Sequence, residues 1–317
     1  MTVHAGIDEA GYGPTLGPLV VASSAFRLAD GARPTGLHRL IALGDHPEGL
    51  PIGDSKKLYR GGAGHDCLET SVLGHAVLGR GHLPRQVQAL LAGMLDCPDE
   101  EVAEQPWYGS GLLALPLPRH AQAERILERA EHQRALLARR GIGFVDFAVA
   151  PVLEPRFNRL TLERGSKAWP LFLAAARLIE ELMARHPQEE LVITVDRHGG
   201  RAYYQQMLAE RFPFVPIAVL RESSRHSAYR LDYPERPPVS VAFVVEADGR
   251  FAPVALASLV AKTVRELFMQ SFNLWFGVAL PGVRPTAGYH GDAHRFLRDV
   301  APLLDVSVPR ARLVRVR

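Results

Sequence analysis

Acidic residues close three separate apolar runs of this 317-residue chain, and this arrangement limits the folds that it can adopt. The runs and their acids are residues 3–7 with Asp8 and Glu9, residues 191–195 with Asp196, and residues 241–245 with Asp248. Short runs rich in Val, Ile and Phe predict β-strands. Ligands of open α/β sheets bind at the carboxyl ends of the strands. We therefore expect the four acids to meet at one edge of a sheet.

Further strand and helix patterns alternate along the chain. Additional strands are predicted at residues 19–26, 142–150 and 214–220, and helices at residues 168–184, 201–211 and 253–275. Pro253 would lie in the first turn of the last helix, where proline is favoured. Alternating strands and helices predict an α/β layered sheet.

One stretch of the sequence departs from this alternation. Residues 60–141 contain glycine clusters, scattered prolines and an arginine-rich helical pattern at 121–140, so we expect an inserted lobe of unknown role. The predicted catalytic domain then comprises residues 1–59 and 142–300. The basic tail, residues 301–317, alternates with period two near its end and could form an edge strand or an arm that contacts phosphates.

Composition excludes several classes of protein. The chain has 37 Lys and Arg residues against 34 acids, a weak bias toward a polyanionic partner. It shows no secretion signal and no apolar run long enough to span a bilayer. The two cysteines, Cys67 and Cys97, lack the spacing of a zinc site or a disulfide framework. We expect a cytoplasmic protein, and a monomer.

A cluster of carboxylates favours divalent metal chemistry. Mutually repelling acids are tolerated when a hard cation lies among them, and ligands that are all oxygens select Mg²⁺ or Mn²⁺ over zinc. Two such ions, roughly 3.5 to 4 Å apart, support in-line hydrolysis of a phosphodiester by activating water and stabilising the leaving oxygen. The alternative is that these acids follow strands only because loops are polar.

A glycine-rich loop follows the first acids. Gly11, Gly13 and Gly17 do not match GxGxxG, because Leu16 occupies the third position. Glycines nevertheless allow a polymer backbone to come close, and amide groups in such turns can receive phosphate oxygens. A tight hairpin turn is the alternative.

These segments together resemble the ribonuclease HII family. The matching segments are residues 6–20 (GIDEAGYGPTLGPLV), which resemble its opening strand and loop, residues 54–58 (DSKKL), residues 246–262, which resemble its KAD…AAASILAK segment, and Gly288, Tyr289 and His294, which resemble its GY…H motif. Phe157 and Asn158 resemble a helix start of the family. Residues 60–141 have no counterpart.

The resemblance implies an RNase H-like mixed β-sheet flanked by helices, and an endonuclease that uses Mg²⁺ or Mn²⁺ to cut the RNA strand of RNA/DNA hybrids. It would leave a 5′-phosphate and a 3′-hydroxyl. The implied catalytic and metal-binding residues are Asp8, Glu9, Asp196 and Asp248. The implied substrate-binding residues are Gly11, Tyr12, Gly13, Ser55, Lys56, Lys57 and Tyr289, with Tyr289 at the sugar where RNA meets DNA. An exposed helix start is the alternative for the lysines, and a half-buried core residue for Tyr289.

The chain departs from the family at several positions. The GRG motif of the family is Gly11-Tyr12-Gly13 here, and tyrosine cannot replace an arginine that binds phosphate through two hydrogen bonds. Cleavage at single embedded ribonucleotides is therefore in doubt. Arg197 or Arg201 could supply the missing charge from another loop.

Two further positions leave alternatives open. His198 is expected to be a solvated loop histidine, with a role in product release or metal exchange as the alternative. Glu246 replaces the lysine of KAD and either adds a ligand or faces solvent.

Two rival functions use the same fold. A binding protein could grip hybrid or structured RNA without cutting it, but clustered negative charge beside phosphates would weaken such binding. A structure-specific DNA nuclease is the other rival, because the arginine of GRG is missing.

Overall fold

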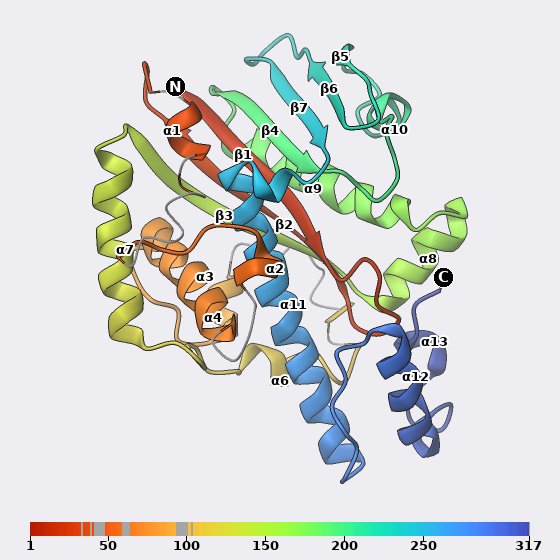
Figure 1. Ribbon diagram of the computed structural model, residues 1–317. Helices are drawn as coiled ribbons and strands as arrows, with labels where there is room; N and C mark the ends of the chain where they lie inside the picture. The colour runs from red at the N-terminus through yellow and green to blue at the C-terminus, as the bar shows by residue number, and fades with distance from the viewer. Residues whose placement is uncertain are drawn as a thin grey trace.

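The centre of the protein is a seven-stranded mixed sheet with the strand order β3-β2-β1-β4-β7-β6-β5 (Figure 1). The computed structural model describes residues 1–32, 34–38, 40, 48–58, 64–92, 101–102 and 104–316. The strands are β1 Thr2–Ala10, β2 Leu19–Leu28, β3 Ile142–Val152, β4 Glu190–Asp196, β5 Ile217–Arg221, β6 His226–Leu231 and β7 Val239–Val244. Strands β1, β4 and β7 are parallel, and the other pairings are antiparallel. The predicted mixed α/β sheet flanked by helices is confirmed.

Helices cover both faces of this sheet. They are α1 Pro34–His38, α2 Ser55–Leu58, α3 Gly64–Arg80, α4 Val87–Leu91, α6 Gly109–Leu113, α7 Ala123–Ala138, α8 Glu154–Arg164, α9 Ala168–Arg185, α10 Gln205–Arg211, α11 Ala252–Ala279, α12 His290–Asp299 and α13 Arg310–Leu313, with short 3-10 turns η1 Ala247–Gly249 and η2 Ala301–Leu303. None of the helices in the described part of the chain has the length and apolar character needed to cross a bilayer.

Strand β1 divides its side chains between two cores. Val3, Ala5 and Ile7 belong to the core that contains α9. Side chains alternate along a strand, so the intervening positions, including Gly6 and Asp8, face the helix α11 on the opposite side. The second core joins α11 to α3 and α7 and to one face of β2. Figure 1 shows α11, in blue, passing along β1 and β2.

The backbones of β1 and α11 come very close at Gly6. A Cβ atom on Gly6 would lie 2.1 Å from the nitrogen of Val254 and 2.2 Å from the carbonyl carbon of Pro253. The Ser24 hydroxyl on β2 donates a hydrogen bond of 2.7 Å to the Pro253 carbonyl. Only glycine leaves room for the helix at this point.

Several helix predictions are confirmed, with shifted ends. The helices expected at 168–184, 253–275 and 121–140 are α9, α11 and α7, whereas the one expected at 201–211 begins only at Gln205. Strand β6 was missed. Its sequence, HSAYRL, combines small, charged and aromatic residues and has no apolar run.

One of the two alternatives for the tail, and one expected helix start, are wrong. The tail forms the short helix α13 and no edge strand among its described residues, because Leu313 and Arg315 are buried against the domain. Phe157 and Asn158 do not start a helix, since α8 already begins at Glu154.

The described residues of segment 60–141 pack into the same core as α11. The indole ring of Trp107 contacts Phe272 and Phe276 of α11, and the Tyr108 ring contacts Phe268. The division of the chain into a catalytic domain, an insertion and a tail stays a prediction.

We predict that Gly6→Ala destabilises the protein by about 3 kcal/mol, because the added methyl group overlaps backbone atoms that cannot move aside separately. Gly277→Ala, in the same helix that Gly6 contacts, is the matched control. A Cβ at Gly277 meets no atom within 4 Å, so the change should stabilise α11 by about 0.5–1 kcal/mol. Urea denaturation measures both values, and equal stabilities would contradict the close contact.

Candidate active site

The four predicted acids lie at one edge of the sheet. Asp8 and Glu9 are near the carboxyl end of β1, and Asp196 is the last residue of β4. Asp248 lies in η1, the short turn that follows β7 after residues 245 and 246. Since β1, β4 and β7 are parallel neighbours, their carboxyl ends coincide, as the sequence predicted.

Backbone hydrogen bonds fix two of these carboxylates. The Asp196 Oδ1 atom accepts a 2.8 Å hydrogen bond from the amide of Ala247, which ties the end of β4 to η1. The Asp8 Oδ1 atom accepts a 2.7 Å hydrogen bond from the amide of Glu9. Glu246, just before η1, has a φ of +52°, a backbone conformation that residues other than glycine rarely adopt. The turn that carries Asp248 is therefore strained.

The carboxylates repel one another. Burial raises the pKa of Asp8 well above its ordinary value, and the charges of Glu9 and Asp196 raise it further. Burial and then the charge of Asp196 raise the pKa of Glu9 to about 8, with a smaller contribution from Asp248. These effects show that the four acids share one electrostatic environment.

The donor set fits a hard divalent cation in its chemistry. All four candidate ligands are carboxylates, and an ion among them would relieve the repulsion that raises their pKa values. Within the described ranges, no three His, Cys, Asp or Glu side chains already stand close enough together to hold a metal. The carboxylates would therefore have to converge when an ion binds.

The predicted backbone-binding segment, Asp54 to Leu58, is joined to the acids through α11. The Ser258 hydroxyl of α11 is hydrogen-bonded both to the Ser55 hydroxyl, at 3.3 Å, and to Asp8. The contact places the start of α2 beside the acid cluster. Lys56 and Lys57 follow in α2, and their side chains lie outside the described part of the chain.

The glycine loop forms the eight-residue connection, residues 11–18, between β1 and β2, so it is not a tight hairpin turn. Gly11 has a φ of +83° and Gly17 a φ of +84°. A Cβ atom on Gly11 would lie 2.5 Å from the Arg265 Nε, and one on Gly17 would lie 2.2 Å from the Met269 sulfur. Both glycines have a backbone conformation that other residues rarely adopt, and side chains of α11 pack against them.

Tyr289 lies next to this loop and is exposed. Its side chain is 58% exposed, so the alternative of a half-buried core tyrosine is wrong. The Arg265 guanidinium lies 5.6 Å from the centre of its ring. The carbonyl of Gly288 accepts hydrogen bonds from the amides of Thr15 and Leu16, at 2.8 and 3.2 Å, which joins the segment before Tyr289 to the glycine loop.

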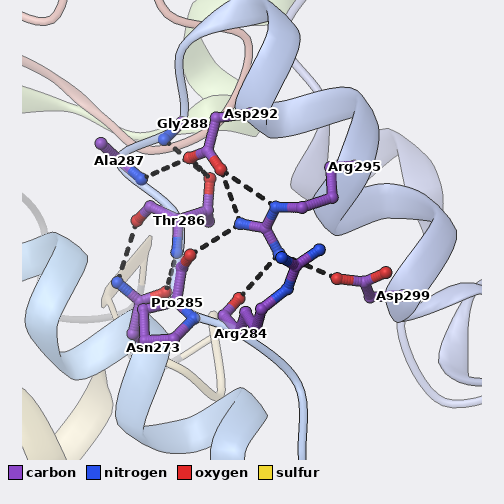
Figure 2. Close-up of polar contacts among 9 residues, drawn as sticks. All are labelled: Asn273, Arg284, Pro285, Thr286, Ala287, Gly288, Asp292, Arg295 and Asp299. Atoms are coloured by element: carbon purple, nitrogen blue, oxygen red, sulfur yellow. Dashed lines mark hydrogen bonds and ion pairs between the residues drawn. The ribbon is translucent and has the colours of Figure 1, made fainter.

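A polar network holds the segment that precedes Tyr289 (Figure 2). The Asp292 Oδ2 atom accepts hydrogen bonds from the Thr286 hydroxyl and the Ala287 amide, at 2.5 and 2.8 Å. Asn273 of α11 both donates to and accepts from the backbone of Thr286. Arg295 donates to the carbonyl of Pro285 and pairs with Asp292. This bonding fixes where α12 begins, and so where Tyr289 stands.

Of the two arginines considered as replacements for the missing one, Arg201 is near the loop. Arg201 and Tyr12 line the same cavity of about 320 Å³, and the positive charge of Arg201 acts on the Tyr12 hydroxyl. Arg197 instead donates a 2.6 Å hydrogen bond to the carbonyl of Ser224. Of these two arginines, the structure therefore favours Arg201 as the replacement.

The expected environment of His198 is wrong. Its side chain is buried between the rings of Tyr204 and Phe243, each 5.6 Å away. Burial lowers the pKa of His198 to about 3, which keeps the imidazole neutral. Glu246 is exposed and faces solvent, the second of the two alternatives for that position.

A larger cavity, of about 410 Å³, lies elsewhere. It is bounded by α3, α11 and the segment before Gly288, and none of the four acids lines it. The four acids lie outside this cavity, at the carboxyl edge of the sheet.

Two arginines of this region were not singled out from the sequence. Arg265 is buried beside Gly11 and donates to the carbonyls of Ala287 and Leu16, at 3.0 and 3.4 Å. It follows Ser258 by seven residues, two turns of the same helix, and this spacing could have found it. Arg315 of the tail also reaches the loop, and no signal in the sequence indicates that contact.

Comparisons with known proteins give likenesses to solved structures alone: no family model and no curated protein matches the chain. The chain is similar to ribonuclease HII in the PCNA complex from Archaeoglobus fulgidus, with 17% identity, a TM-score of 0.43, and coverage of 99% of this chain and 94% of that one. For RNase H3 of Aquifex aeolicus the values are 14%, 0.40, 98% and 70%.

A third similar structure is Bst-RNase HIII in complex with Mn²⁺, with 18% identity, a TM-score of 0.41 and coverage of 94% of this chain. This chain spans 62% of that protein's length. All three are named as ribonucleases of the H type. At these identities and TM-scores the likenesses do not define an activity, which has to be inferred from the residues of this chain.

We predict that Asp8→Asn stabilises the metal-free protein at pH 8. The raised pKa of Glu9 means that stability is lost as the pH rises from about 4.5, the ordinary value, through about 8. Removing the Asp8 charge relieves the repulsion in that range, so the melting temperature should rise by about 2–4 °C.

At pH 4.5 the same substitution should have little effect, because these carboxyls are then largely protonated. Glu163→Gln, at a surface carboxylate that is 54% exposed, is the control and should stay within about 0.5 kcal/mol of wild type. Thermal melts in EDTA measure all three proteins. A change that is the same at both pH values would refute mutual repulsion.

Proposed function

We propose that this protein is a Mg²⁺- or Mn²⁺-dependent endonuclease that hydrolyses the RNA strand of RNA/DNA hybrids. The observation that carries the proposal is that four carboxylates, Asp8, Glu9, Asp196 and Asp248, lie at the shared carboxyl edge of three parallel strands, where they influence one another's charge. Their mutual repulsion supports a role for bound cations. The sequence resemblance to ribonuclease HII supports the same conclusion.

Each part of the site has a role in this reaction. The four carboxylates would hold the ions, which supply an activated water and stabilise the leaving oxygen. Asp8 is additionally held by Ser258, and Asp196 by the amide of Ala247, so these two carboxylates are the best oriented for ligation. Ser55 lies one hydrogen bond from Ser258 and would contact the substrate backbone near the acids.

The surroundings of the acids suit a nucleic-acid backbone. Recognition of RNA within a duplex depends on the 2′-hydroxyl and on backbone shape. The glycine loop has little side-chain bulk, and Gly13 is open, with no atom within 4 Å of the place of a Cβ. The exposed ring of Tyr289 lies beside the loop and would pack against a sugar. Arg201, near Tyr12, would supply the positive charge that residues 11–13 lack.

The test of this proposal is cleavage of three end-labelled duplexes: an RNA/DNA hybrid, a DNA duplex with one ribonucleotide, and all-DNA. We expect cleavage of the hybrid that requires Mg²⁺ or Mn²⁺. Asp8→Asn and Asp196→Asn should each lower the rate by roughly 10²–10³ or more, because each removes charge from the reacting centre. Both ions should also raise the melting temperature of wild type more than that of either variant.

Glu163→Gln is the matched control, a carboxylate removed from the surface of α8, and it should cleave like wild type. Folded wild type that binds the hybrid tightly but does not cut it with either ion would make the protein a binding module. Cleavage of all-DNA at the rate of the hybrid would make it a nuclease of different specificity. The duplex with one ribonucleotide shows whether the enzyme with Tyr12 in this loop cleaves at a single embedded ribonucleotide.

We also predict that Tyr289→Ala raises KM for the hybrid about tenfold, because the substrate loses one packing surface. The ring is exposed, so the variant should retain its stability. Phe214→Ala is the control, since the Phe214 side chain is 96% exposed on another part of the surface. Equal KM values for both variants and wild type would remove Tyr289 from the substrate site.

A further inference from the structure

One side chain of the basic tail is buried beneath the glycine loop. Arg315 is 3% exposed, and its guanidinium donates hydrogen bonds to three carbonyls of the loop. The Nη1 atom donates to Gly11 and, at 3.4 Å, to Gly17, and the Nη2 atom donates to Tyr12 at 2.8 Å. A single planar group thus connects the beginning of the loop to its end.

The backbone around Arg315 is fixed on both sides. The Arg315 amide donates to the Thr15 carbonyl at 2.9 Å. Asn158 of α8 donates to the carbonyl of Val314 at 2.8 Å and accepts from the amide of Val316 at 2.7 Å. This pairing explains why Asn158 lies inside a helix: its side-chain amide hydrogen-bonds the backbone of residues 314 and 316.

The surroundings of the guanidinium compensate for its burial. Burial lowers the pKa of Arg315 to about 10, and the negative charge of Glu154 offsets part of this effect. The guanidinium carbon lies 3.9 Å from the centre of the Phe157 ring. Glu154 is itself fully buried and accepts a 2.7 Å hydrogen bond from the Tyr108 hydroxyl. A hydrogen-bonded charge close to an opposite charge can remain ionised inside a protein. Removing one partner of such a pair lowers the stability of the fold strongly.

The direction of these hydrogen bonds sets the direction of the loop amides. In a trans peptide the C=O and N–H bonds point in opposite directions. Because the carbonyls of Gly11 and Tyr12 point at Arg315, the amides of Tyr12 and Gly13 point away from it. Among the described residues, neither amide donates a hydrogen bond. The guanidinium therefore determines which side of the loop carries unpaired N–H groups.

We propose that Arg315 is a positioning residue that holds the glycine loop in the shape that substrate binding needs. It acts on the loop through hydrogen bonds to backbone carbonyls. The side chain at the centre of the loop is Tyr12, which carries no positive charge. This inference rests on the proposed function, because it concerns the same substrate site. It assigns the basic tail a role inside the protein, distinct from an arm that contacts phosphates.

The test compares Arg315→Met, Arg315→Lys and Arg310→Met. Methionine retains packing on Phe157 without the charge, and lysine retains the charge but not the planar fork that spans three carbonyls. Arg310 is exposed in the same tail and serves as the matched control. Two quantities are measured: amide hydrogen exchange of residues 11–18, and KM and kcat for the RNA/DNA hybrid with Mg²⁺.

We expect Arg315→Met to increase exchange of the hydrogen-bonded Thr15 and Leu16 amides of the loop at least tenfold, leave β4 and α9 protected, and raise KM at least tenfold. Arg315→Lys should lie between Met and wild type, and Arg310→Met should match wild type. If Arg315→Met raises exchange throughout the protein, the whole fold is destabilised. Exchange and KM of Arg315→Lys then decide whether Arg315 acts on the loop.

Two outcomes would overturn the proposal. One is unchanged exchange in the loop, even with a raised KM, because the effect on KM would then not pass through the loop. The other is faster exchange in the loop with unchanged KM. Failure of the proposed function is distinguishable, since wild type would then cut no hybrid. In that case the exchange data and the affinity for uncut hybrid still test Arg315.

Discussion

The contact of the α11 backbone with β1 at Gly6 is the constraint on which the rest of the structure depends. No side chain separates the helix from the strand there, so the two elements have one relative position. That position carries Ser258 to Asp8 and Arg265 to Gly11 and Tyr289. A helix held farther from the sheet would leave the acids without their hydroxyl partner and the glycine loop without its support.

The acid cluster is the opposite kind of feature, because its members do not stabilise one another. Burial and like charge both raise the pKa values of Asp8 and Glu9. The parallel pairing of β1, β4 and β7 forces the acids together, and two deep apolar cores compensate for the unfavourable charge. Local instability at one edge of a well-packed sheet is typical of sites that bind ions.

The sequence predicted those features that depend on strand ends and on periodicity. The four acids could be placed at one edge because each follows an apolar run, and α9 and α11 could be placed because their apolar patterns are long. Strand β6 could not be predicted, since its burial comes from β7 and β5 and not from its own composition. His198 was misjudged because a histidine next to glycines looks exposed until Tyr204 and Phe243 enclose it. The contact of Arg315 with the loop depends wholly on tertiary structure.

The position of Arg315 has a consequence for the order in which the protein becomes complete. The arginine follows Gly11 by 304 residues, and domains form while the chain is made from its N-terminus. The hairpin of β1 and β2 and its loop therefore emerge long before the residue that sets the shape of the loop. A nascent chain can possess Asp8 and Glu9, and later all four acids, and still have a loop without its guanidinium. Maturation of the candidate site is thereby coupled to the synthesis of the 304 residues that follow Gly11 up to Arg315.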